Sequence, residues 1–210
     1  MRNLPAKASR AAVFAGATAV VAAATVGAFA QQAAPNQPPR GWYKTCGKEQ
    51  DIDICNVQHQ VLAQTGQLLT AVQLAEFTGK VNRRVLQVSV PINRLLPAGV
   101  VMQIDANKPT KLDFTTCLQD RCVADVPLTD AIVGNLKKGS ELTLTTYNFQ
   151  NQPNPIKVSL EGFTGVYDGP GMQQADLAER RKATEDYIMK NQQKLADQLK
   201  EAQEKAKAGN

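Results

Sequence analysis

The chain has 210 residues, of which 43% are hydrophobic and 20% charged, an ordinary composition for a globular protein. A single histidine, His59, is too few for metal or acid–base sites that are built on histidine clusters. Three basic residues, Arg2, Lys7 and Arg10, lie within the first 30 residues, which contain no acidic side chain. Residues 31–210 hold 21 basic and 19 acidic side chains, and this near-neutral balance argues against nucleic-acid binding.

Residues 1–30 have the pattern of a cleavable export signal. Three basic side chains precede residues 11–30, which carry no charge, and Ala28-Phe29-Ala30 has the small-x-small form of a signal-peptidase site. A retained membrane anchor is the alternative, because about 20 uncharged residues can span a bilayer. Ten of these residues are Ala and none is Leu or Ile, which favours cleavage. We therefore predict export across a membrane and an extended, Pro-rich leader over residues 31–40.

Four cysteines, Cys46, Cys55, Cys117 and Cys122, lie in the exported part. Three pairings are possible, and proximity favours Cys46–Cys55 and Cys117–Cys122, each closing a polar turn. Zinc binding is the alternative, but zinc sites use closer cysteine spacings, and redox-active pairs have the Cys-x-x-Cys form. The sequence therefore predicts two structural disulfides, which suits an oxidising compartment.

Short segments in which apolar and polar residues alternate follow one another along the exported chain. The expected strands lie at residues 42–46, 52–62, 68–77, 86–90, 100–105, 111–117, 122–126, 142–145 and 156–161. Residues 111–117 and 122–126 are expected to be the two arms of a disulfide-linked hairpin. Many short strands separated by turn residues are typical of a β-sandwich or barrel.

One short helix is expected between Pro127 and Gly139, with Thr129 as its N-cap. Its apolar residues Leu128, Ile132 and Leu136 share one face, which suits a helix that closes one end of a sandwich. The basic residues just before Gly139 suit the negative end of the helix dipole.

The composition changes after Gly171, since residues 172–207 contain no Gly, Pro or Cys and predict a long charged helix. A narrow apolar seam runs along it, formed by Ile188, Leu195, Leu199, Ala202 and Ala206. Fewer than three good heptads are present. The segment is therefore either a solvated tail or an arm for docking or oligomerisation.

Candidate catalytic or metal-binding side chains are few. His59 lies in a strand-like segment without a visible nucleophile or orienting partner, so we interpret it as a surface or strand histidine. Asp51 and Asp53 have the spacing of paired carboxylates or a cation site, but they also fit the solvated face of a strand.

Two further motifs have ordinary interpretations. Lys80, Arg83 and Arg84 form a small basic turn that is weak as a binding patch for anionic lipid or polysaccharide. A phosphate loop must be followed by a helix, and no helix is expected after Gly162-Phe163-Thr164-Gly165. This motif is therefore interpreted as a strand bend or bulge.

Five motifs in this order and spacing resemble the invasion-associated locus B (IalB) family of exported alphaproteobacterial proteins. They are Trp42-Tyr43-Lys44-Thr45-Cys46, Val90-Pro91 followed by Leu96-Pro97-Ala98-Gly99-Val100, Phe114-Thr115-Thr116-Cys117 with Cys122-Val123-Ala124, Leu136-Lys137-Lys138-Gly139, and Val158-Ser159-Leu160-Glu161-Gly162-Phe163-Thr164. One departure is Arg121, where the family usually has Gly. The helical segment after Gly171 lies outside the resemblance.

The resemblance implies an all-β fold, an immunoglobulin-like β-sandwich with one short helix, to which this chain adds a C-terminal helical extension. The expected division is a signal peptide (1–30), a leader (31–40), an IalB-like domain (41–168) and a charged helical tail (169–210). The family is linked to host-cell entry in its pathogenic members, and it brings no catalytic residue, metal ligand or cofactor.

We therefore expect a non-enzymatic envelope or periplasmic protein that binds a protein or an envelope component, with the C-terminal helix as one contact. Peripheral membrane association is compatible with this expectation, and nucleic acid is not an expected partner. A small-ligand or glycan-binding module on an open sheet face is the alternative. A periplasmic enzyme that uses His59, Asp51 or Asp53 is the third hypothesis.

Overall fold

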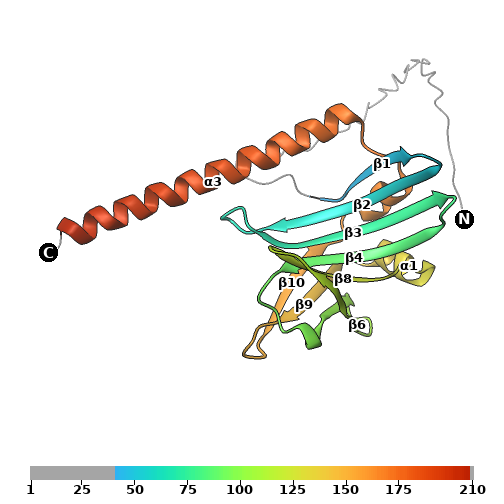
Figure 1. The fold of residues 1–210 in the computed structure, drawn as a ribbon, viewed down its shortest axis with the longest axis horizontal. Coiled ribbons are helices and arrows are strands. Elements are labelled where there is room, and N and C mark those ends of the chain that lie inside the picture. The colour runs from blue at the N-terminus through green and yellow to red at the C-terminus, as the bar shows by residue number, and fades with distance from the viewer. Residues whose placement is uncertain (1–40, 209–210) are drawn as a thin grey trace, which may run out of the picture. The chain divides into compact units, whose positions relative to one another are not determined.

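The computed structural model describes residues 41–208, so the expected signal peptide and leader lie outside the described residues. In this range the chain forms two antiparallel sheets, short helices and a long C-terminal helix (Figure 1). The elements are β1 (Tyr43–Glu49), β2 (Ile52–Leu62), β3 (Leu68–Gly79), β4 (Arg83–Pro91), the 3₁₀ helix η1 (Leu96–Ala98), β5 (Val100–Ile104), β6 (Thr110–Leu112), β7 (Phe114–Cys117), β8 (Arg121–Pro127), α1 (Asp130–Lys138), β9 (Glu141–Tyr147), β10 (Pro153–Ser159), α2 (Phe163–Asp168) and α3 (Gln174–Ala208).

One sheet has the strand order β1-β2-β3-β4-β8-β7, and the other has the order β10-β9-β5-β6. The first four strands therefore form a meander within a single sheet. In immunoglobulin domains no more than two consecutive strands stay in one sheet before the chain crosses to the other. The two-sheet, mainly β architecture agrees with the expectation, whereas this strand order differs from the immunoglobulin-like order that the resemblance implies.

The segment expected to be one hairpin arm at residues 111–117 is divided between the two sheets. Leu112 is buried in β6 and pairs with Val100 of β5, whereas Phe114 in β7 pairs with Ala124 of β8. The exposed Asp113 lies between the two strands. Leu112 is buried and Phe114 is partly buried against the same core, so the corner follows from tertiary packing.

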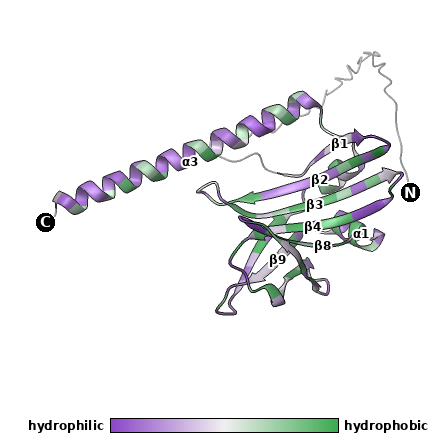
Figure 2. Cartoon of the chain, in the orientation of Figure 1, coloured by the Kyte–Doolittle hydropathy of each residue, from purple (hydrophilic) through white to green (hydrophobic). Residues whose placement is uncertain are grey.

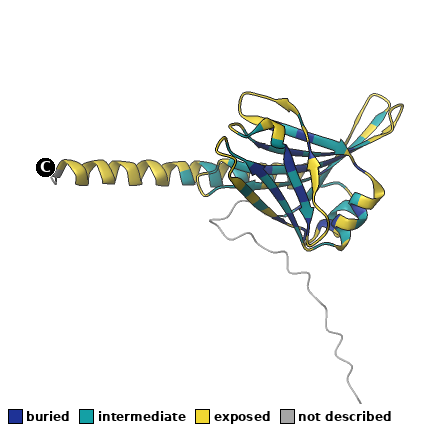
Figure 3. Cartoon of the chain, turned by 90° about the horizontal axis from the view of Figure 1, so that it is seen from below, coloured by how far each residue is buried: buried dark blue, intermediate teal, exposed yellow. Residues whose placement is uncertain are grey.

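The inner faces of the two sheets share one hydrophobic core (Figure 3). Alternation explains its composition, since Val72 and Leu74 of β3 and Leu142 and Leu144 of β9 are all buried. Trp42 closes this core near β10, where its Nε1 donates a hydrogen bond of 2.8 Å to the Ser159 carbonyl. The rest of the core is formed by apolar residues of β2, β4, β5, β6, β8 and β10, of the short helices and of the segments beside them.

Helix α1 agrees with its sequence signals. The Thr129 side chain accepts a hydrogen bond from the Ile132 N–H at 3.3 Å, and Leu128, Val133 and Leu136 are buried.

The interpretation of residues 162–165 as a strand bend or bulge was wrong, because the left-handed Gly162 (φ 76°) precedes the helix α2. Phe163 in α2 is fully buried, with its ring centroid 4.8 Å from that of Trp42. This six-residue helix is held by its buried aromatic side chain, and a segment so short has almost no helical signal of its own.

Helix α3 has 35 residues, and its surroundings change along its length (Figure 3). Up to Asn191 it has half-buried positions, and every residue from 192 to 207 is exposed. Between residues 41 and 208, no helix is long and apolar enough to cross a membrane.

Candidate binding site

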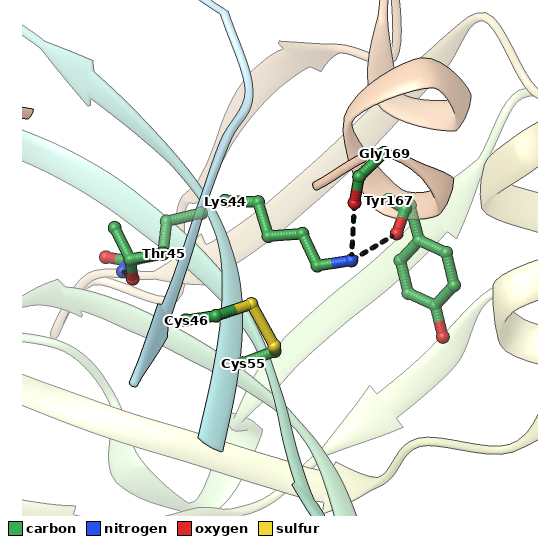
Figure 4. The surroundings of a disulfide bond; sticks show 7 residues. Lys44, Thr45, Cys46, Cys55, Tyr167 and Gly169 are labelled. Atoms are coloured by element: carbon green, nitrogen blue, oxygen red, sulfur yellow. Dashed lines mark hydrogen bonds between the residues drawn. A yellow bond between two sulfur atoms is a disulfide. The ribbon is translucent and has the colours of Figure 1, made fainter. Parts of the chain in front are cut away.

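The chain that leads into α3 is attached along the edge strand β1. The Lys44 Nζ donates hydrogen bonds to the carbonyls of Tyr167 and Gly169 at 2.8 and 2.9 Å (Figure 4). The Met172 N–H donates to the Lys44 carbonyl at 2.7 Å, as an added strand would. A Cβ at Gly171 would lie 3.1 Å from the Cys46 nitrogen, so only glycine fits this approach comfortably. The segment thereby covers a sheet edge that would otherwise have unpaired backbone groups.

The disulfides join directly opposite residues of two hairpins. Cys46 of β1 faces and is bonded to Cys55 of β2, and Cys117 of β7 is bonded to Cys122 of β8. These are the pairs that the sequence predicts. The Cys46–Cys55 bond lies beside the Lys44 contacts (Figure 4), so it holds the strand to which the start of α3 is attached.

The first half of α3 packs through one face against β1, β2 and the turn between β2 and β3. Its half-buried residues recur every three or four positions, as one helix face requires, at Leu177, Arg180, Thr184, Tyr187, Ile188 and Asn191. The Arg180 Nη2 donates to the Gly41 carbonyl at 3.0 Å, and its guanidinium lies 4.2 Å from the Tyr43 ring centroid. Ile188 packs against Gly66, where a Cβ would be only 3.2 Å from the isoleucine side chain.

A cleft of about 380 Å³ lies between this half of the helix and the outer face of β1 and β2. Thr45, Gln58 and Gln60 contribute polar groups from the strands, and Arg180, Arg181 and Thr184 contribute polar groups from the helix. Tyr43 also lines it, and its hydroxyl donates to the Gln58 Oε1 at 3.3 Å. The Gln58 Nε2 in turn donates to the Thr45 Oγ1 at 3.4 Å, which orients the amide. Glu185 is the one carboxylate among the residues that line the cleft.

Sequence reasoning did not identify this cleft. Thr45, Gln58 and Gln60 alternate with inward-facing residues, so the pattern marks them only as the outer face of a hairpin. Arg180 and Thr184 are four residues apart on a helix, which marks only a shared face. These residue types indicate no partner until α3 is placed beside them.

His59 is not the surface histidine that one interpretation allowed. It lies half-buried in β2 on the inner face, with its ring centroid 5.2 Å from that of Trp42. Burial, together with the nearby charge of Arg180, lowers the pKa of His59 from 6.5 to about 4. Among the described residues, its Nδ1 has no hydrogen-bond partner. The side chain is therefore a neutral ring at the margin of the core at pH 7.

Asp51 and Asp53 are exposed, as their interpretation as a solvated face predicts. Asp51 forms an ion pair with Lys80 at 2.5 Å, and Asp53 lies 3.9 Å from Lys48. Such exposed pairs contribute about 0–1 kcal/mol. The structure, over residues 41–208, contains no group of three or more His, Cys, Asp or Glu side chains that could hold a metal ion.

Arg84 belongs to a structural network instead of a basic patch. It bonds to Glu76 at 3.0 Å, to Asp130 at 2.6 Å and to the Tyr167 hydroxyl at 3.0 Å. The hydroxyl of Tyr167 donates to Glu76, and burial together with this carboxylate raises the pKa of Tyr167 to about 12. The network connects β3 and β4 with α1 and α2, and these polar groups satisfy one another.

The neighbouring basic residues also have acidic partners. Arg83 lies 3.8 Å from Asp125, and Lys137 of α1 pairs with Asp168 of α2 at 2.6 Å. The Lys137 ammonium also lies 4.8 Å from the Tyr167 ring centroid. This lysine therefore joins the two short helices in addition to meeting the end of the α1 dipole.

Comparison with protein families matches residues 42–171 to the family described as "Invasion associated locus B (IalB) protein". The chain belongs to the IalB family. The matched region ends at Gly171, so it contains β1 and the segment attached to it and leaves out α3. The strand side of the cleft is thus part of the IalB domain, and its helix side is an addition to that domain.

Two relatives are invasion protein B homologs of Brucella abortus, from strain 2308 and from biovar 1 strain 9-941. Each is 33% identical over 130 residues, which is 60% of this chain and 73% of the relative. The crystal structure of invasion associated protein B from Bartonella henselae superimposes with a TM-score of 0.53 at 20% identity. That match covers 60% of this chain and 88% of the solved one, and it supports the fold alone.

Proposed function

We propose that this IalB-family protein is an exported, non-enzymatic protein of the periplasm or cell envelope that binds a helical segment of a partner protein through the exposed half of α3. Two disulfides support an oxidising compartment. The observation that carries the proposal is the arrangement of apolar and charged residues after Asn191.

Leu195, Leu199, Ala202 and Ala206 recur at spacings of four, three and four residues and form what we call the distal seam. Leu195 is 42% exposed and Leu199 is 56% exposed. All seven charged side chains of residues 192–207 fall about 90° or more from the centre of the seam on a helical wheel. Figure 2 shows α3 as a mostly hydrophilic helix with narrow apolar bands along it. This is the pattern of a helix that packs against another helix.

The composition of the distal seam favours a protein helix over a lipid surface. Its two leucines and two alanines form a narrow stripe, and alanine permits close approach of a second backbone. A helix that lies on a membrane has a broad apolar face with aromatic anchors and many basic residues. Residues 192–207 have no aromatic side chain and carry four basic and three acidic ones.

Cross-linking in intact cells tests the proposal, with partners identified by mass spectrometry. The full-length protein is compared with Leu195→Gln/Leu199→Gln, which disrupts the distal seam, and with Asp197→Asn/Glu204→Gln, which alters two exposed positions opposite it. Because all four side chains are exposed, both variants should unfold at the temperature of the parent protein. We expect the seam variant to lose one defined partner and the control to retain it.

Two outcomes contradict the proposal. Equal partner capture by all three proteins would show that the distal seam is not the binding surface. A concentration-dependent homodimer in analytical ultracentrifugation that the seam variant abolishes would show that the seam binds a second copy of this chain.

A further inference from the structure

The cleft between α3 and the β1–β2 hairpin has the size and chemistry of a small-ligand site. Its volume of about 380 Å³ falls in the range of ligand pockets and fits one or two sugar rings. Its strand side offers the hydroxyl of Thr45 and the amides of Gln58 and Gln60, which can donate to and accept from sugar hydroxyls. This lining is independent of the distal seam, which begins beyond the docked half of the helix.

The helix side adds positive charge to this polar surface. Arg180 and Arg181 both line the cleft, and Glu185 is the single acidic residue there, which leaves a net charge of +1. Arginine binds a carboxylate through two parallel hydrogen bonds. Arg181 is exposed at the cleft, where a ligand can reach its guanidinium. Glu185 supplies an acceptor for a ligand hydroxyl and disfavours anions of higher charge.

Several of these groups are already held in place. Arg180 is fixed by its contact with the Tyr43 ring and by its bond to the Gly41 carbonyl. The Gln58 amide is oriented between Tyr43 and Thr45, and the Thr184 hydroxyl donates to the Arg180 carbonyl at 2.9 Å. Groups that are ordered before binding lose little conformational entropy when the ligand arrives. The polar groups of Gln58, Arg180 and Thr184 are therefore preorganised, and Arg181 is the exposed cation of the cleft.

We infer that this cleft binds a carboxylated sugar, a uronic acid alone or at the end of a short saccharide, with Arg181 on the carboxylate and Gln58 and Gln60 on the ring hydroxyls. The ligand touches both the IalB domain and the added helix. Its binding therefore stabilises the docked half of α3 on β1 and β2.

Titration calorimetry of the full-length protein with D-glucuronate and with digalacturonate tests the inference. D-glucose tests the ring without the carboxylate, and acetate and inorganic phosphate test the anion without the ring. We expect a uronate to bind at least about tenfold more tightly than glucose, acetate or phosphate. A higher affinity for digalacturonate would identify a saccharide end as the ligand, and equal affinities would identify the free acid sugar.

The variants are Arg181→Gln and Gln60→Ala in the cleft, with Lys194→Gln as a matched loss of positive charge on the free half of α3. Arg181→Gln should weaken uronate binding at least about tenfold, and Lys194→Gln should not change it. Hydrogen exchange should show slower exchange of residues 177–191 when uronate is bound. All of these positions are exposed, so thermal unfolding should confirm that each variant remains folded.

Four results overturn the inference. They are no uronate binding at millimolar concentration, equal affinity for glucose, equal affinity for acetate or phosphate, and equal loss in Lys194→Gln and Arg181→Gln. None of them bears on the distal seam, whose partner is tested separately.

Discussion

The two halves of α3 have similar composition but different surroundings. The docked half contacts the sheet through Arg180, Thr184 and Tyr187 as much as through Leu177 and Ile188, whereas the free half exposes its leucines and alanines. The two faces lie nearly in line along the helix, within about 40° of each other. The difference therefore comes from the sheet, which extends beside the first half of the helix only. A free half that retains an apolar seam has a surface that the domain itself does not use.

The difference between the docked and the free half of α3 should be changed most by removing the Cys46–Cys55 bond. Cys46→Ser with Cys55→Ser frees a short loop in the unfolded chain and should lower the free energy of unfolding by about 2–3 kcal/mol. Because β1 holds the start of α3, hydrogen exchange of residues 177–191 should also accelerate. Denaturant unfolding and exchange mass spectrometry measure the two effects.

The matched control is Cys117→Ser with Cys122→Ser, which releases the β7–β8 hairpin. It should destabilise the domain by about 2 kcal/mol without selectively changing exchange in α3. Selective loss of α3 protection in the control, or unchanged protection in the first variant, would show that the disulfide beside β1 does not hold the docked half.

A smaller effect should appear in the pH dependence of the free energy of unfolding, through His59, whose pKa is sensitive to the docked half of α3. The pKa of His59 is about 4 in the folded protein and 6.5 in the unfolded chain, so the unfolded chain takes up the proton first as pH falls. The stability that the neutral ring contributes is therefore present above pH 6.5 and is lost down to about pH 4. Because His59 is only partly buried, we expect the free energy of unfolding to fall by about 1–2 kcal/mol between pH 6.5 and pH 4. His59→Gln should lack this contribution to the pH dependence.

The charge of Arg180 is the second cause of this pKa, after burial. In Arg180→Gln, the His59 pKa measured by NMR should rise but stay below 6.5. An unchanged pKa would mean that the docked helix does not reach His59 electrostatically in solution.

The smallest effect should follow from ending the chain after Asn191. Residues 192–207 are exposed, so their removal should change the free energy of unfolding by less than about 0.5 kcal/mol. Circular dichroism should show a loss of helix that corresponds to these residues alone. A clear drop in thermal stability would show that the free half packs against the domain, which would remove the contrast between the two halves.

Much of the sheet structure follows from local pattern. The alternation in residues 52–62 predicts β2 at its observed bounds, Thr129 and Gly139 delimit α1, and the lack of Gly and Pro in residues 172–207 predicts α3. The order of the strands in the sheets, the corner at Asp113 and the helix after Gly162 were not predictable in this way. Each of them depends on which residues are buried together, and no local period encodes that.

For the candidate site, too, some features follow from local sequence pattern and others depend on tertiary structure. The residue types on its two sides are visible in the sequence, and so is the distal seam, because a period of two or of 3.6 assigns each residue to a face. Only the tertiary structure places Arg180 over Tyr43 and opens a cleft between Gln60 and Arg181, since these residues are more than 100 positions apart in the chain. The sequence by itself determined most of the strands, the cysteine pairs and the amphipathic helix, all of which depend on near neighbours. The docking of α3, and with it the cleft, depends on contacts between distant segments that become specific only once the sheet has formed.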